Sequence, residues 1–195
     1  MKISVIIANP NPSSFSHAMA DAALEVIPET CQIFLHDLYE EKFQPVLEES
    51  EADNYSSSNP LVEQHCQEIS EADAILIFRP NWWGQPPAIL KGWIDRVLRP
   101  GVAYDYRIGD SPADIPLGLL KAECALVFNT SNTPWEREVE VFGNPLQILW
   151  KNCIFDLCGV STFERKVFGP MVSSSLEARQ NWLDEVKAST RNYIF

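Results

Sequence analysis

Two adjacent tryptophans between prolines are the residues of this sequence best suited to hold a flat ligand. The segment 79–87 reads Arg-Pro-Asn-Trp-Trp-Gly-Gln-Pro-Pro. The indoles of Trp82 and Trp83 offer flat apolar faces for an aromatic ligand. The prolines restrict the loop, and Gly84 permits close approach of the backbone to a ring. The alternative is that the indoles pack in the core or form a subunit contact. Composition alone does not distinguish this alternative from ligand binding.

A serine-rich segment near the N-terminus has the chemistry of a phosphate site. Ser13, Ser14 and Ser16 precede an amphipathic stretch, 18–26, which predicts a helix with hydroxyl groups at its amino end. Hydroxyls and free amides there suit a negatively charged group. The alternative is an ordinary helix cap. The sequence contains neither GxGxxG nor GxxxxGK[ST], which disfavours a dinucleotide Rossmann site and a P-loop.

The other polar side chains give no catalytic acid or base and no metal site. The histidines are His17, His36 and His65, and we expect each to be a surface or packing residue. Alternate glutamates at 136, 138 and 140 are typical of a solvated face, because a metal would need several converging carboxylates.

Composition and charge narrow the class of protein. With 195 residues and 46% hydrophobic residues, we expect a single domain over 1–195. A net charge of -12 disfavours nucleic acid and membrane surfaces as partners. Five cysteines without a CxxC pair favour a reduced compartment and thiols that pack in the core. Since no signal-peptide or membrane-spanning pattern is found, we expect a cytoplasmic protein.

Short apolar runs alternate with helical patterns along the chain, which predicts an α/β fold. Right-handed crossovers would then give a doubly wound five-stranded parallel sheet in the order 2-1-3-4-5, with helices on both faces. The predicted strands are 3–8, 31–38, 74–78, 124–128 and 162–168, and the predicted helices are 18–26, 61–71, 88–98, 144–158 and 176–192.

The predicted topology assigns the ligand site to three loops. In such sheets the ligand lies beyond the carboxyl ends of the strands, where the strand order reverses. We therefore expect the loops 9–16, 80–87 and 129–134 to meet there. The acidic segment 40–59 is predicted to cross the surface as a loop.

The second loop and the helix after it carry a motif. Pro80, Trp83, Pro87-Ala88, Leu90-Lys91 and Trp93 are followed by Asp95-Arg96-Val97 and Gly101-Val102-Ala103-Tyr104. In this the chain resembles the flavodoxin-like NAD(P)H:quinone oxidoreductase family, which carries P-x-x-W-x-x-x-P-A-x-L-K-x-W, then D-R-V and G-x-A-Y. The resemblance extends back to the first loop and forward to Leu157-Cys158-Gly159, so it covers nearly the whole chain.

The resemblance implies a flavin cofactor. FMN is favoured over FAD because the chain lacks the C-terminal extension of the larger members. The first loop would meet the ribityl phosphate, the second would line the isoalloxazine ring, and amides of the second and third loops would stabilise the reduced ring. The implied cofactor-binding residues are Asn9, Ser14, Phe15, Ser16, Pro80, Asn81, Trp82, Trp83, Gly84, Thr130, Ser131 and Asn132.

The chain departs from the family pattern in three places. Asn9 stands where members often have a histidine, so no imidazole is expected at the phosphate. The third loop lacks the glycines of a T-x-G sequence. Where some members have a Tyr and a His that share the charge of the reduced flavin, this chain has Glu136 and Phe142, so that relay is not carried over.

The implied function is reduction of quinones or similar planar acceptors by NADH or NADPH through the flavin. The resemblance also implies a homodimer, and the segment 105–116 would cover the acceptor pocket or contact the partner. Two alternatives stay open. One is a non-enzymatic flavin sensor or a regulatory subunit of a transport protein, and the other is a flavodoxin-type electron carrier.

Overall fold

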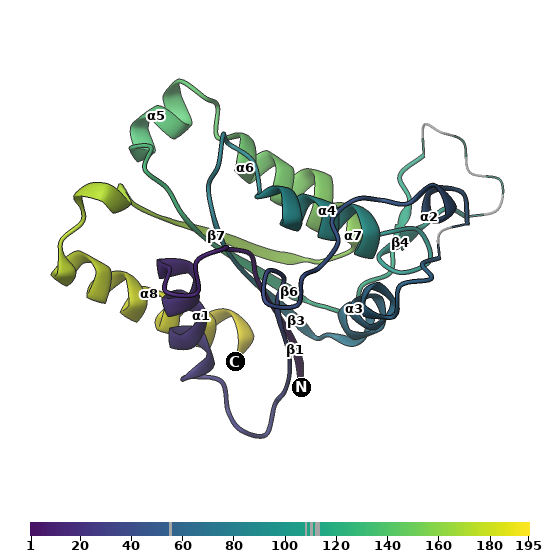
Figure 1. The fold of residues 1–195 in the computed structure, drawn as a ribbon, viewed down its shortest axis with the longest axis horizontal. Coiled ribbons are helices and arrows are strands. Elements are labelled where there is room, and N and C mark those ends of the chain that lie inside the picture. Colours follow the sequence, from purple (N-terminus) through teal and green to yellow (C-terminus); the bar gives the residue numbers. More distant parts are fainter. Residues whose placement is uncertain (55, 108, 110, 112–113) are drawn as a thin grey trace.

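A single parallel sheet organises the computed structural model, which describes residues 1–54, 56–107, 109, 111 and 114–195 (Figure 1). Its strands lie in the order β2-β1-β3-β6-β7, and every neighbouring pair is parallel. The predicted order is therefore confirmed. The strands are β1 (Lys2–Ile7), β2 (Gln32–Asp37), β3 (Ala74–Pro80), β6 (Cys124–Thr130) and β7 (Thr162–Phe168).

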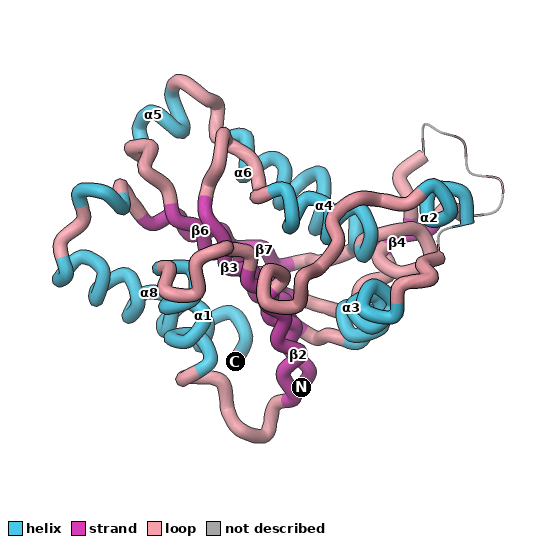
Figure 2. Tube along the Cα trace, in the orientation of Figure 1, coloured by secondary structure: helices cyan, strands magenta, loops and turns pink. Residues whose placement is uncertain are grey.

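Helices cover both faces of this sheet, as Figure 2 shows. Every residue of β3 and of β6 is buried, because an all-parallel sheet is packed on both sides. One face packs against α1 (Phe15–Leu24) and α8 (Leu176–Ile194). The other packs against α3 (Pro60–Glu71), α4 (Ala88–Val97) and the helical segment 145–158. None of the described helices is both long and apolar enough to cross a bilayer.

The helical segment 145–158 is not a uniform α-helix. It comprises α6 (Pro145–Ile148), a π-helical stretch η1 (Leu149–Phe155) and α7 (Asp156–Cys158). A π turn is wider than an α turn, so residues five apart share one side. Trp150 and Phe155 are both buried, with ring centroids 5.8 Å apart. The predicted helix is present, and its wide middle lets two large rings face the sheet.

The connections add short elements. β4 (Tyr104–Asp105) pairs antiparallel with β5 (Leu117–Gly118), and the predicted insertion 105–116 between them lies partly outside the described residues. The other short elements are α5 (Trp135–Glu140) and η2 (Met171–Ser173). Helix α1 begins at Phe15, three residues before the predicted start, because Ser14 serves as its cap.

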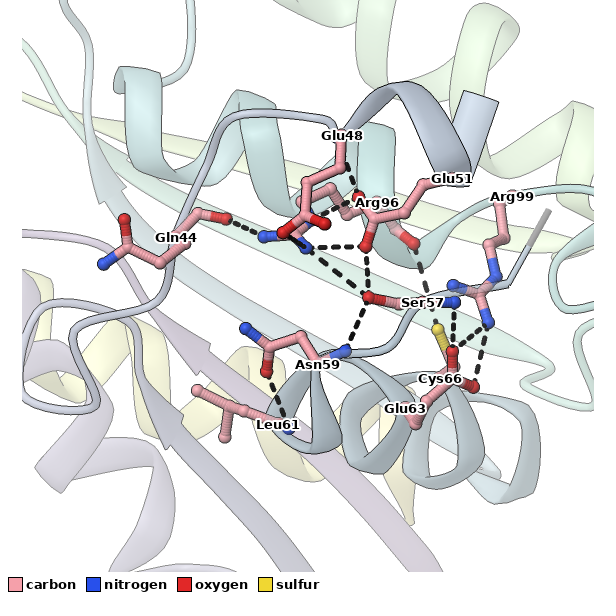
Figure 3. A network of polar contacts seen from close by, with 10 residues as sticks. All are labelled: Gln44, Glu48, Glu51, Ser57, Asn59, Leu61, Glu63, Cys66, Arg96 and Arg99. Atoms are coloured by element: carbon pink, nitrogen blue, oxygen red, sulfur yellow. Dashed lines mark hydrogen bonds and ion pairs between the residues drawn. The ribbon is translucent and has the colours of Figure 1, made fainter. Parts of the chain in front are cut away.

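The acidic segment 40–59, predicted to be a loop, contains helix α2 (Glu49–Asn54). The cause is a buried ion pair with Arg96 of α4 (Figure 3). Arg96 donates from Nε and Nη2 to the Glu51 carboxylate at 2.8 and 2.6 Å, and from Nη1 to the Gln44 carbonyl at 2.5 Å. Burial disfavours ionisation of Glu51, but the Arg96 hydrogen bonds outweigh it and lower its pKa to about 2.

The cysteines are free in the structure. Cys66, Cys124 and Cys158 are buried, and burial raises the pKa of each thiol to about 11. The prediction of packing thiols is confirmed for these three. It is wrong for Cys153, which is exposed on the π-helical segment.

We expect Glu51→Gln to destabilise the protein by about 3 kcal/mol at pH 7, because it removes the buried, hydrogen-bonded counter-charge of the Arg96 guanidinium. The carboxylate that remains, Glu48, is exposed and lies 3.6 Å from Arg96. Urea unfolding measures this. The Glu51 carboxylate has a lower pKa when folded, so its contribution is complete above the ordinary value of 4.5 and is lost as the pH falls toward 2. The free energies of unfolding of the variant and of the wild type should therefore converge as the pH falls from 4.5 toward 2.

The matched control is Glu49→Gln, an exposed position on the same helix. It should change the free energy of unfolding by less than about 0.5 kcal/mol. Equal stabilities of the two variants would show that the buried pair does not hold the segment.

Candidate functional site

The carboxyl ends of β1, β3 and β6 bring the three predicted loops together. The strand order reverses beside β1, since β2 and β3 lie on opposite sides of it. Backbone bonds join the loops: the Ala8 amide donates to the Phe78 carbonyl at 2.9 Å, and the Asn81 amide donates to the Thr130 carbonyl at 2.7 Å. The expected meeting of these loops is confirmed.

The first loop is folded by its own side chains. Asn9 Oδ1 accepts the Asn11 amide at 3.1 Å, and Asn9 Nδ2 donates to Ser16 Oγ at 3.2 Å. Ser14 is the N-cap of α1 and its Oγ accepts the amide of His17. Phe15 packs edge-on against Trp182 of α8, with centroids 5.9 Å apart. The loop thus presents a capped helix end beside β1.

His17, predicted to be a surface or packing residue, lies at this loop. Its Nδ1 is 2.9 Å from Ser14 Oγ, and its Nε2 is 2.8 Å from Asp37 Oδ2 at the end of β2. The spacing of three residues from Ser14 is one helical turn, and that signal could have predicted the contact. Beside it is a hollow of about 420 Å³ lined by Asn9, Pro10, Pro12, His17, Asp37, Tyr39 and Glu40.

The second loop makes a tight turn with the tryptophans at its tip. The Gln85 amide donates to the Trp82 carbonyl at 2.9 Å, and Trp83 and Gly84 have φ of 56° and 65°. Two left-handed residues in succession define a type I′ turn. This conformation strains a bulky residue such as tryptophan, and such strain is common at functional sites. Trp83 is fully exposed at 101%, and Trp82 at 43%.

A cleft of about 500 Å³ opens beside this turn. We call it the β3–β6 cleft, and it is lined by Asn81, Trp83, Gly84, Thr133, Glu138, Phe142 and Pro145. Asn81, Trp83 and Gly84 were among the predicted residues, whereas Trp82 is not part of the lining. Buried Asn81 Oδ1 and Glu138 Oε1 accept no hydrogen bond from the described residues. The cleft therefore suits a flat ligand with N–H groups.

In the third loop, the prediction that an amide faces a ligand is wrong for Ser131. The Ser131 amide donates a hydrogen bond to the Phe168 carbonyl at 2.9 Å, so it is not available to a ligand. The Ser131 carbonyl accepts the Met171 amide at 3.0 Å. Asn132 Oδ1 accepts the Val172 amide, also at 3.0 Å. Ser131 and Asn132 thus tie the loop to the end of β7 and to η2.

A buried charged layer under the cleft was not predicted. Arg79, at 0% exposure, donates from Nη1 to the carbonyls of Gln85 and Pro80 at 2.9 and 3.0 Å. This guanidinium holds the Trp82–Gln85 turn from below and lies 5.7 Å from the Trp150 ring. Burial, and then the charge of Arg165, lower the pKa of Arg79. Fixed positive charge is therefore buried against the Trp82–Gln85 turn.

Glu138 balances part of this charge, and the prediction of a solvated glutamate face is wrong for it. Glu138 is 2% exposed, whereas Glu136 and Glu140 are exposed. The negative charge of Glu138 favours the charged forms of Arg79 and Arg165 and so acts to raise the pKa of each, against the effect of burial. Alternate spacing suggested one face, but a helix turns 100° per residue, so Glu138 points inward. Phe142 does line the cleft, half exposed, at the position aligned with a relay residue.

His36 and His65 are buried and belong to a cluster away from the cleft. His36, Glu41 and His65 have potential metal-ligand atoms within 4.8 Å of one another. However, His65 Nδ1 accepts the Trp93 indole N–H at 2.8 Å, so its Nε2 must carry the proton. The nitrogens of His36 face Glu41 and Glu68 at 2.8 and 2.5 Å. Burial lowers the His36 pKa, but these carboxylates outweigh it and raise the pKa. These contacts hold the three side chains together as one cluster.

Comparison with known proteins agrees with this architecture. A family model described as Flavodoxin-like fold matches residues 1–192. A Haemophilus influenzae protein named "Uncharacterized NAD(P)H oxidoreductase" is 32% identical over 195 residues, covering 96% of this chain and 93% of that protein. The rat "Ribosyldihydronicotinamide dehydrogenase [quinone]" is 29% identical over 217 residues, covering 96% and 91%.

A solved structure shows the same likeness. The NAD(P)H:quinone oxidoreductase from Methanothermobacter marburgensis superposes with a TM-score of 0.80 at 27% identity, over 98% of this chain and 96% of that one. Fold and site define a flavodoxin-like α/β protein with a cleft at its strand ends. The chain belongs to the flavodoxin-like NAD(P)H:quinone oxidoreductase family.

We expect Glu138→Gln to destabilise the protein by about 2 kcal/mol, because it leaves buried Arg79 and half-buried Arg165 with less compensating charge. Chemical denaturation at pH 7 measures the effect. Glu140→Gln, an exposed change on the same helix, is the control and should be neutral. If both variants were as stable as the wild type, Glu138 would not neutralise the buried layer.

Proposed function

We propose that this protein is an FMN-dependent oxidoreductase that passes hydride from NADH or NADPH to quinones or similar planar acceptors. One observation carries the proposal: the β3–β6 cleft and the capped end of α1 lie at the same edge of the sheet. A flat ring and a phosphate joined by a short chain would fit this pair of features. The names of the Haemophilus, rat and Methanothermobacter proteins support the same reaction.

The residues present fit a flavin. Ser14, with the amide of Phe15, would hold the phosphate, and the hydrogen bond from Asn9 to the buried Ser16 hydroxyl would fix the loop. The ring would lie in the cleft against Trp83, and the unpartnered oxygens of Asn81 and Glu138 are acceptors for its N–H group. Pro80, Trp82, Gly84, Thr130, Ser131 and Asn132 would shape the surrounding loops. When bound, the flavin supplies the hydride chemistry.

The chain contributes binding, orientation and electrostatics. Arg79 and Arg165 leave net positive charge beneath the cleft after Glu138 is counted, and this favours a ligand that gains negative charge on reduction. Arg79 also fixes the turn that carries Trp83. We assign no side chain as a catalytic acid or base, so protons would come from solvent or acceptor.

We further propose a cytoplasmic homodimer. Exposed Trp83 and Phe142 at the cleft leave apolar surface that a second copy would cover, completing the acceptor pocket. Free thiols, one of them exposed, suit a reducing compartment. We favour FMN over FAD, and the choice between NADH and NADPH is an outcome of the experiment below.

The test is reconstitution with FMN followed by anaerobic addition of NADH and, separately, NADPH. We expect a protein-bound flavin band near ~450 nm that one or both nucleotides bleach. Menadione should then restore the band. A bound flavin that neither nucleotide reduces would favour a sensor, a regulatory subunit or an electron carrier. Failure to bind FMN would overturn the proposal.

Trp83→Ala should weaken FMN binding about tenfold, since stacking on an aromatic side chain contributes on the order of 1 kcal/mol beyond area burial. Quenching of flavin fluorescence on titration measures the dissociation constant. Trp135→Ala is the matched control, because Trp135 is also exposed but does not line the cleft. An equal effect of the two substitutions would contradict the assigned ring site.

A further inference from the structure

We infer that Glu138 is a specificity-determining residue that favours planar acceptors carrying an N–H group over acceptors that lack one. The inference rests on the proposed function and deepens it, because it names the class of acceptor that the β3–β6 cleft would take. That class is amino-substituted quinones and similar flat molecules with an amino group on the ring. The recognising group is the side chain of Glu138, which α5 places at the cleft.

Glu138 combines deep burial with an unused hydrogen-bond acceptor. It lines the cleft although it is only 2% exposed. From the described residues, its Oε2 accepts one long hydrogen bond, from Asn81 Nδ2 at 3.5 Å, and its Oε1 accepts none. A buried oxygen without a donor is unfavourable, because it has lost its hydrogen bonds to water. A ligand that brings an N–H group to this oxygen would restore the lost bond.

One acceptor of the cleft remains for a second ligand beside the flavin. Asn81 Oδ1 and Glu138 Oε1 both lack a donor among the described residues, whereas an oxidised isoalloxazine ring carries a single N–H group. Asn81 follows β3 directly and leads into the turn against which the ring would lie. Glu138 belongs to a different element, α5, in the connection after β6. This placement gives Asn81 Oδ1 to the flavin and leaves Glu138 Oε1 for the acceptor.

The other side chains of the cleft do not distinguish one flat ring from another. Trp83 and Phe142 offer aromatic surface, and none of the described residues that line the cleft carries a positive charge. A quinone carbonyl only accepts hydrogen bonds, so it makes none with a carboxylate oxygen. An amino substituent donates. A site with a buried polar group disfavours the analogue that leaves this group unpaired, so Glu138 sets the preference.

The test compares two naphthoquinones that differ in one substituent. The compound 2-amino-1,4-naphthoquinone carries an amino group where menadione carries a methyl group of similar size. Each is titrated into the oxidised, FMN-loaded protein without NADH or NADPH, so calorimetry measures binding and no turnover occurs. We expect the wild type to bind the amino compound about tenfold more tightly, which corresponds to one hydrogen bond. Equal affinities, or tighter binding of menadione, would overturn the inference.

Substitutions test whether the preference comes from Glu138. Glu138→Leu removes both oxygens, so the ratio of the two dissociation constants should fall to about one. Glu138→Gln keeps one neutral acceptor oxygen and should give an intermediate ratio. A general defect of the cleft would weaken the binding of both compounds alike and leave the ratio unchanged. Glu140→Gln, an exposed change on the same helix, is the control and should keep the wild-type ratio.

The outcomes separate this inference from the proposed function. A preference that persists in Glu138→Leu would overturn the inference, since the N–H group would then bond elsewhere. If Glu138→Leu does not fold, Glu138→Gln decides, and a ratio equal to that of the wild type contradicts the role of Glu138. In both cases a wild type that binds FMN and is reduced by a nicotinamide keeps the proposed function. Failure of the wild type to bind FMN would overturn both.

Discussion

The parallel alignment of β1, β3 and β6 is the constraint on which the site depends. Because these neighbouring strands run in one direction, their carboxyl ends share one edge, and the loops 9–16, 80–87 and 129–134 meet there although they are far apart in the sequence. The edge is held by backbone bonds from Ala8 to Phe78 and from Asn81 to Thr130. The helix cap, the tryptophan turn and the cleft all follow from this alignment.

Buried guanidinium groups fix the loops that the sheet gathers. Arg79 donates to carbonyls of the turn that carries Trp83, and Arg96 donates to Glu51 and to the Gln44 carbonyl. A guanidinium suits this task because its planar donors satisfy several acceptors at once. Each requires an anion nearby, so Glu138 and Glu51 are as necessary as the arginines. The order of the segment 44–51 and of the Trp82–Gln85 turn thus depends on the same kind of contact.

The strands and most helices could be predicted because burial on two faces leaves continuous apolar runs, as in 74–78 of β3. What the sequence could not give was the direction of individual polar side chains. Glu138 looked like one of three solvated glutamates until α5 turned it inward, and Glu51 ordered a segment that reads as a loop. His17 was set aside although one helical turn separates it from Ser14. The directions of these side chains depend on contacts with residues elsewhere in the fold, and hydrophobic periodicity does not predict such contacts.

The π-helical segment has a consequence for how this chain is aligned with others. A π turn holds one residue more than the α turn it replaces, and here it lets Trp150 and Phe155 both face the sheet. Against a relative with an unbroken α-helix, a correct alignment must place a one-residue gap within 149–155. An alignment without that gap would pair Phe155, and the residues after it up to the next gap, with residues of the relative that are not structurally equivalent. It would therefore understate the sequence identity of the two chains in this region.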